Sequence, residues 1–221
     1  MRDFTLKELY AWCRIPAAEL ENHPQRKIPF RLCKDSAEMG ALMARELVDE
    51  IRAHNARGLV TRAIVPCGPT CWYQPFTELV NREKISLKNL VVFHMDECLD
   101  WQGQRLPRNH PLNFHTYMLE HFYNPVSPEL AVPEQNRKWL FPETMSEIQR
   151  EIWAAPIDIT YGGWGQDGHI AYNQARRHPF NQLSLEDLRQ STIRIQENNL
   201  DTILALSQRM FGTAYQFVPP M

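Results

Sequence analysis

The stretch LVTRAIVPCGPTCW, residues 59–72, places a strand and the start of a helix on either side of one turn. Its first eight residues are mostly apolar and β-branched, which is typical of a buried strand. Gly68 and Pro69 then break the strand, and a helix is predicted from Trp72 to Asn81. Backbone N–H groups at a helix start attract anions, so this turn is a candidate phosphate site with the Thr70 hydroxyl. An ordinary strand-to-helix turn is the alternative, because the two common glycine-rich phosphate motifs are absent.

The strand–helix alternation continues on both sides of this stretch. Further strands are predicted at residues 29–33, 89–97 and 157–163, and further helices from Asp35 to about Asn55–Gly58, at 114–122, at 144–153 and after Asn199. Such alternation predicts an α/β domain with a mainly parallel open sheet and helices on both faces, a Rossmann-like arrangement. Ligands of these sheets bind beyond the carboxyl ends of the strands.

The 221 residues suit one large domain rather than two. Residues 1–28 carry a short helical pattern, formed by Leu6, Leu9, Tyr10 and Cys13, and are expected to be an extension that packs on the main fold. Residues 29–221 are expected to form the α/β domain. Its first helix has a capping-box spacing at Asp35 and Glu38, followed by a stripe of Met39, Met43, Leu47 and Ile51.

Composition excludes several classes of partner. The chain has 24 Lys and Arg against 26 Asp and Glu, a balance that does not favour nucleic acid or an anionic membrane. It has no apolar run near the ~20 residues of a membrane span and no signal-peptide pattern at its start. The five scattered cysteines are expected to be reduced thiols in a cytoplasmic protein.

Polar residues follow the strand predicted at 89–97. In the sequence FHMDE, alternation places His94 and Asp96 on one side and Glu97 on the other. A carboxylate at such a strand end can act as a general base, which makes Asp96 a candidate. The alternative is that these acids only cap a helix or a turn.

The sequence GGWGQDGHIAYNQ, residues 162–174, is the third polar loop at a strand end. Its glycines permit left-handed or closely packed backbone. Asp167 and His169 could form a carboxylate–imidazole pair that fixes the tautomer of the imidazole. A plain turn is one alternative. A metal site of His94, Asp96, Asp167 and His169 is another, although no helical ligand spacing supports it.

Taken together, VPCGPT, FHMDECLDW, NHPLNFHTYM, IDITYGGWGQDGHIAYNQ and, more loosely, LSQRMFGTAYQFVPP resemble the glucosamine-6-phosphate deaminase (isomerase) family, which is related to the 6-phosphogluconolactonases. The segments occur in the family's order across about residues 30 to 221, and DGHIAYN favours the deaminase branch. The resemblance implies conversion of glucosamine 6-phosphate to fructose 6-phosphate and ammonia without metal or cofactor. A different sugar phosphate, or an inactive sugar-phosphate-binding regulator, are the alternatives.

The resemblance also implies roles for single residues. His169 would open the sugar ring by moving a proton on the ring oxygen, and Asp167 would orient it. Asp96 would carry the proton between C2 and C1. The phosphate would be held by Gly68, Thr70 and Arg209. The partner would be a small sugar phosphate, and the family contains both monomers and hexamers, so a homo-oligomer is one of two expected states.

Three departures from the family pattern affect this expectation. Gln174, a candidate catalytic residue, replaces an acid that partners the ring-opening histidine; an amide can hydrogen-bond but cannot stabilise an imidazolium by charge. Pro69 replaces a glycine in the phosphate turn, which removes one N–H donor. By the resemblance, the domain over 29–221 is expected to lack the family's C-terminal βα unit, which supplies a phosphate-binding lysine. Gln174 and Pro69 favour a changed substrate, whereas Gln174 and the missing unit favour the regulator.

Overall fold

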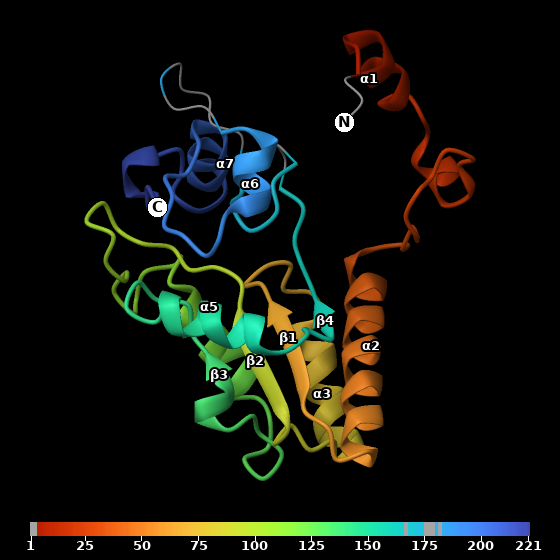
Figure 1. The fold of residues 1–221 in the computed structure, drawn as a ribbon, viewed down its shortest axis with the longest axis vertical. Coiled ribbons are helices and arrows are strands. Elements are labelled where there is room, and N and C mark those ends of the chain that lie inside the picture. Colours follow the sequence, from red (N-terminus) through yellow and green to blue (C-terminus); the bar gives the residue numbers. More distant parts are fainter. Residues whose placement is uncertain (1–3, 166–167, 175–179, 181–182) are drawn as a thin grey trace.

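The computed structural model describes residues 4–165, 168–174, 180 and 183–221. One parallel sheet has the strand order β3-β2-β1-β4, with β1 at Thr61–Val65, β2 at Leu90–His94, β3 at Arg137–Lys138 and β4 at Ile159–Thr160. Helix α5 lies in front of this sheet and α3 lies behind it (Figure 1). The predicted α/β fold, with a parallel sheet and helices on both faces, is therefore confirmed.

The helices follow the predicted order along the chain. They are α1 (Leu6–Trp12), α2 (Ser36–Ala56), α3 (Tyr73–Glu83), α4 (Phe114–Met118), α5 (Met145–Ala154), α6 (Leu185–Gln190) and α7 (Leu200–Met210). A π-helical turn, η2 (Leu119–Tyr123), extends α4, and short 3-10 turns are η1 (Ala17–Asn22), η3 (Glu134–Asn136) and η4 (Tyr215–Phe217). Strand β3 and helix α6 were not predicted, because each is too short to show a periodic pattern. None of the described helices is both long enough and apolar enough to cross a bilayer.

The strand predicted at residues 29–33 is wrong. These residues pair with none of the strands in the described part of the chain, and the backbone N–H of Leu32 donates to the Glu21 carboxylate at 2.5 Å. Phe30 and Leu32 remain 38% and 47% exposed. The apolar residues that suggested a strand therefore have no sheet edge to pair with, and they form an extended link into α2.

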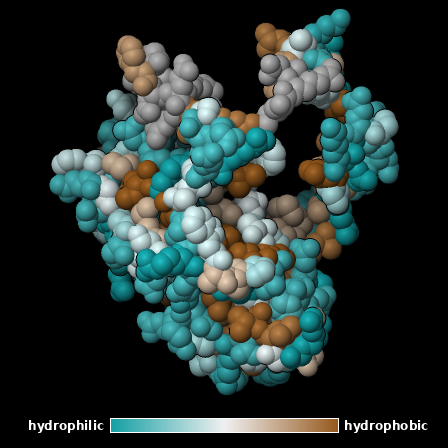
Figure 2. All heavy atoms as spheres, in the orientation of Figure 1, coloured by the Kyte–Doolittle hydropathy of each residue, from teal (hydrophilic) through white to brown (hydrophobic). Residues whose placement is uncertain are grey.

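The N-terminal extension does not pack on the main fold, contrary to expectation. No residue of α1 or η1 is buried. The extension instead projects from the start of α2, and an open space separates it from the C-terminal part of the chain (Figures 1 and 2). Its apolar side chains contact one another, as Phe4 and Trp12 do with ring centroids 5.5 Å apart.

Helix α2 begins and ends where the sequence predicts. The Asp35 carboxylate accepts the backbone N–H of Glu38 at 2.9 Å, and Gly58 leaves the helix with a φ of +67°. The buried face is shifted from the predicted stripe and consists of Gly40, Ala44, Leu47, Val48 and Ile51. This face packs against α3 and β1, so α2 covers the same side of the sheet as α3.

Gly40 allows α2 to pack directly on the turn that precedes α3. A Cβ atom at this position would overlap the carbonyl group of Cys71 and lie 3.1 Å from the Trp72 nitrogen. Backbone atoms cannot swing aside as a flexible side chain can. The glycine therefore sets how closely α2 approaches the turn at residues 67–72.

We predict that Gly40→Ala destabilises the protein by about 1–3 kcal/mol, the usual cost of overpacking, although alanine is the better helix former. Thermal and urea unfolding measure the change. Ala41→Gly, at the neighbouring exposed position, calibrates the effect of helix propensity alone. An unchanged or higher stability of Gly40→Ala would show that the two backbones separate without cost.

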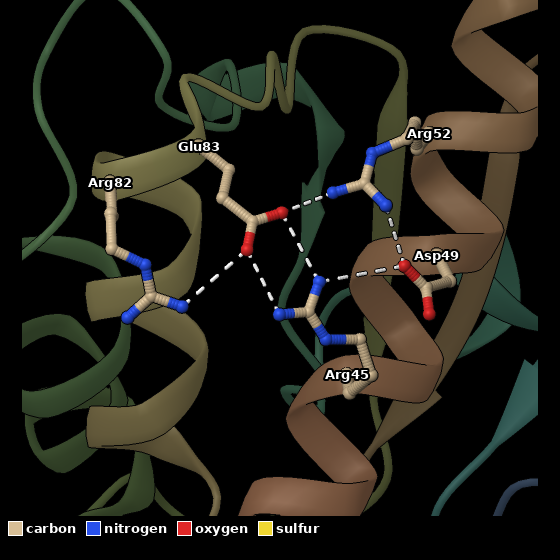
Figure 3. A network of polar contacts seen from close by, with 5 residues as sticks. All are labelled: Arg45, Asp49, Arg52, Arg82 and Glu83. Carbon is tan, nitrogen blue, oxygen red and sulfur yellow. Dashed lines mark hydrogen bonds and ion pairs between the residues drawn. The ribbon is translucent and has the colours of Figure 1, made fainter.

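A charged network joins α2 to α3 on the surface (Figure 3). The Glu83 carboxylate accepts two bonds from Arg45, at 2.9 and 3.1 Å, and also contacts Arg52 and Arg82. Asp49 lies 2.7 Å from Arg52 and completes the network. The hydrogen bonds from Arg45 are the main reason that the pKa of Glu83 is lowered to about 2.

We predict that Glu83→Gln lowers the melting temperature at pH 7. The folded pKa of Glu83 is depressed, so its contribution is present above the unfolded pKa and disappears as the pH falls toward 2. The difference from wild type should therefore shrink between pH 5 and pH 2. Glu78→Gln, on an exposed position of the same helix, is the matched control. A constant difference across this range would show that the charge of Glu83 is not the cause.

Candidate active site

The loops that follow β1, β2 and β4 meet at one edge of the sheet. These strands are parallel, so their carboxyl ends lie together, and α6 and α7 lie above them (Figure 1). The backbone N–H of Met95 donates to the Val65 carbonyl at 2.9 Å. A Cβ at Gly163 would lie only 3.0 Å from the Gly68 carbonyl oxygen. The three loops singled out in the sequence are therefore neighbours.

Asp96 is a partly buried carboxylate just beyond the end of β2. Its Oδ1 atom is shielded from solvent and has no hydrogen-bond partner among the described residues. Burial raises the pKa of Asp96 to about 6, against smaller opposing effects from the Cys67 backbone and from His169. A carboxylate with a free acceptor atom and a pKa close to neutrality is suited to accept a proton and return it.

Glu97 has a different task from Asp96. Its carboxylate accepts the backbone N–H groups of Cys98 at 3.0 Å, Phe114 at 2.8 Å and His115 at 2.8 Å. These bonds join the Asp96 loop to the start of α4. Burial still outweighs them, and it raises the pKa of Glu97 to about 7. The sequence leaves open that the acids after this strand only cap a helix or a turn, and Glu97 has this capping role at the start of α4.

The His94 side chain is engaged by aromatic residues, although it lines a small cavity together with Asp96. Its Nε2 lies 3.0 Å from the Tyr123 hydroxyl, and its ring stacks on Trp139 with centroids 3.8 Å apart. Burial is the main reason that the pKa of His94 is lowered to about 3. The metal site that includes His94 therefore has no support. Among the described residues, the one group of suitable metal ligands is Glu50, His54 and Asp158, in which His54 contacts Thr61 and Asp158 accepts the Arg62 N–H.

The loop with His169 depends on close backbone packing. A Cβ at Gly165 would overlap the His169 imidazole, and the Gly165 N–H donates to the His169 carbonyl at 2.9 Å. Gly168 has a φ of +83°, as the glycine pattern predicts. Ala171 and Tyr172 also have positive φ, which is unusual for side-chain-bearing residues and stores strain in this turn. Asp167, the predicted partner of His169, lies outside the described residues.

Gln174 is buried beside His169. Its Nε2 lies 3.3 Å from His169 Nδ1 and donates to the Thr202 hydroxyl at 2.6 Å. Its Oε1 accepts the backbone N–H of Asn199 at 3.0 Å. The sequence pairs His169 with Gln174 only through the family resemblance, and it gives no signal for Asn199 and Thr202, which lie 25 and 28 residues away.

Two cavities flank Tyr172. One of about 90 Å³ includes Asp96 and Glu97, and a larger hollow of about 540 Å³ includes His169 and Arg209. Tyr172 lines both and stacks on His169 at 5.4 Å. Ligand pockets usually measure about 300–1,000 Å³, so the larger hollow has the size for a small ligand. Sequence reasoning missed Tyr172, because an aromatic residue in a glycine-rich loop resembles ordinary packing.

The three predicted phosphate-binding residues do not all line the same cavity. Arg209 is exposed in the last turn of α7 and shares the larger hollow with His169. Gly68 and Thr70 are exposed on the turn before α3 and do not line that hollow. The role of all three at one phosphate therefore stays a prediction.

Comparison with known proteins gives a consistent picture. No family model matches the chain. A glucosamine-6-phosphate deaminase of Mannheimia succiniciproducens is 31% identical over 208 residues, which are 88% of this chain and 68% of that protein. One of Phocaeicola vulgatus is 32% identical over 154 residues, 68% of this chain and 52% of that protein.

The fold also has a solved counterpart. A monomeric glucosamine-6-phosphate deaminase superposes with a TM-score of 0.62 at 21% identity, covering 85% of this chain and 71% of that one. The chain spans about half to two thirds of the length of the curated relatives described above. The identity of 31% across 68% of the Mannheimia protein shows that the chain belongs to the glucosamine-6-phosphate deaminase family.

Proposed function

We propose that the chain binds a 6-phosphorylated amino sugar and converts it to a ketose phosphate with release of ammonia. The supporting observation is the Asp96 carboxylate, whose solvent-shielded Oδ1 has no hydrogen-bond partner among the described residues and whose pKa burial raises to about 6 at the carboxyl edge of the sheet. The relatives named as glucosamine-6-phosphate deaminases make glucosamine 6-phosphate the first substrate to test.

Asp96 is the proposed base for proton transfer between C2 and C1. Its pKa of about 6 leaves most of the carboxylate ionised at pH 7, and therefore able to accept a proton. Because burial raises its pKa toward neutrality, the protonated form is also accessible, so the same carboxyl group can return the proton to the neighbouring carbon. The unpartnered Oδ1 is the oxygen available for this transfer.

We predict that Asp96→Asn lowers turnover by ~10²–10⁴, the usual contribution of a positioned base, and leaves sugar-phosphate binding nearly intact. The wild-type activity should fall as the pH drops through about 6, where Asp96 becomes protonated. Ammonia release and calorimetric binding measure the two effects. Asp49→Asn, on the surface of α2, is the matched control. Activity of Asp96→Asn within a few-fold of wild type would remove Asp96 from the mechanism.

The phosphate group is proposed to bind Arg209 and the turn at residues 67–72. Arginine offers a planar fork of donors that matches phosphate oxygens, and Arg209 lines the hollow that contains His169. Thr70 lies three residues before the first residue of α3, where backbone N–H groups and the helix dipole favour an anion. Binding would bring these two elements to the same ligand.

We predict that Arg209→Ala weakens binding of glucosamine 6-phosphate by about 1.5–3 kcal/mol, the range for a charge-assisted hydrogen bond. Affinity for unphosphorylated glucosamine should hardly change. Arg189→Ala, on the exposed face of α6, is the control. Equal losses for both sugars would mean that Arg209 supports the structure of α7 instead of binding phosphate.

A second candidate function is favoured by the amide of Gln174, which faces His169 where the family has an acid. The chain would then act on a different sugar phosphate, or bind one as a regulator without turnover. Ligand-dependent melting without ammonia release would support this second candidate. For either function we propose a cytoplasmic location, since all five cysteines are free thiols.

A further inference from the structure

The side-chain amide of Gln174 has a fixed orientation. Its Oε1 lies 3.0 Å from the backbone nitrogen of Asn199, at the start of α7. A backbone N–H can only donate, so the atom that faces it must be an acceptor. Rotating the amide by 180° would place an NH₂ group against the Asn199 N–H. The amide oxygen therefore stays on Asn199, and Nε2 stays on the side of His169 and Thr202.

The orientation of the Gln174 amide determines whether the His169 nitrogen that faces it is a donor or an acceptor. Amide nitrogen Nε2 is a donor, and it lies 3.3 Å from His169 Nδ1. An Nδ1 atom that carried a proton would set two donors against each other. A flipped imidazole would place a carbon there and leave one amide hydrogen without this acceptor. The favourable arrangement has an unprotonated Nδ1, so the proton of the neutral ring is on Nε2.

We propose that Gln174, held by Asn199, fixes His169 as the Nε2–H tautomer, so that its imidazole donates a hydrogen bond to an oxygen of the bound sugar phosphate. Gln174 and Asn199 are positioning residues in this proposal, because they act through His169. A carboxylate at position 174 would have the opposite effect. It can only accept, so it would favour a proton on Nδ1 and leave a lone pair on Nε2.

The tautomer decides which kind of ligand atom can bind to Nε2 of His169. This assignment of the ligand atom rests on the proposed function of the site. A ring-opening base at Nε2 needs a lone pair, which this tautomer lacks. A neutral Nε2–H instead suits an acceptor, such as the carbonyl oxygen of an open-chain sugar phosphate. Asp96 would remove the proton from the adjacent carbon, the C–H electrons would form the enediolate double bond, and its oxygen would accept from Nε2–H. Return of that proton to the neighbouring carbon, together with transfer of the remaining hydroxyl proton from one enediolate oxygen to the other, completes an aldose–ketose isomerisation.

Nitrogen NMR of ¹⁵N-histidine-labelled protein tests the tautomer directly, with His169→Gln to assign the resonances. In the wild type, Nδ1 should have the chemical shift of an unprotonated nitrogen and Nε2 that of a protonated one. Gln174→Glu should reverse the two. Gln135→Glu, an exposed position on η3, is the matched control and should change neither. Asn199→Pro, which removes the N–H that orients the amide, should weaken the wild-type preference.

Fructose 6-phosphate serves as the ligand probe in the same experiment. Its addition should move the Nε2 resonance and leave Nδ1 unprotonated. A proton on Nδ1 in the wild type, or the same tautomer in Gln174→Glu, would overturn the proposal. An Nε2 resonance that does not respond to saturating ligand would overturn the assigned ligand contact.

Ammonia release from glucosamine 6-phosphate is measured separately on the same proteins. If the predicted tautomer is found without ammonia release, the deaminase function fails and the tautomer proposal stands. If ammonia is released while Nδ1 carries the proton, the proposal fails and the function stands. An increase in ammonia release by Gln174→Glu, together with the reversed tautomer, supports a loss of ring-opening basicity in the wild type.

Discussion

The parallel pairing of β1 with β2 and β4 is the constraint on which the candidate site depends. Residues Thr61–Val65 pair in register with Leu90–His94, and Ala63 and Ile64 pair with Ile159 and Thr160. Because all three strands run the same way, the segments that follow them leave at one edge. This arrangement places the turn at residues 67–72, the Asp96 carboxylate and the His169 loop at the same edge of the sheet, although they come from segments up to about 100 residues apart.

The site contains two neighbouring carboxylates whose ionised forms are disfavoured by burial, and hydrogen bonds from the surrounding fold offset part of this cost. Asp96 and Glu97 are neighbouring carboxylates in a partly buried loop, and burial raises the pKa of each. Glu97 is compensated by three backbone N–H groups, which hold the loop against α4. Asp96 keeps one oxygen without such a partner among the described residues. Two adjacent acids therefore differ in their surroundings: backbone donors hold Glu97 in place, whereas Asp96 keeps an oxygen for the proposed proton transfer.

Helix α7 connects the loop at His169 to the rest of the site. Its first residues hold Gln174 through the Asn199 N–H and the Thr202 hydroxyl, and its last turn carries Arg209. A shift of α7 would therefore change the imidazole partner and the candidate phosphate contact together. The strained turn at Ala171 and Tyr172 lies between His169 and Gln174, and strain of this kind is typical of functional loops.

The sequence by itself determined the fold class, the longer helices and the three loops at the strand ends. These features depend on local signals: apolar periodicity, the cap at Asp35, and glycines where the backbone must turn or pack closely. The strand predicted at residues 29–33 failed because strand formation needs a partner edge, and no local pattern shows whether one exists.

Tertiary structure decided which polar groups meet. The His94 imidazole contacts the Tyr123 hydroxyl, a partner 29 residues away that strand alternation does not predict. The orientation of Gln174 depends on an N–H that lies 25 residues further along the chain. Hydrogen-bond partners at such separations are set by how the strands and α7 pack. The spacing of residues along the sequence does not predict this packing. The residue types were therefore visible in the sequence, and their protonation and pairing were fixed only by the fold.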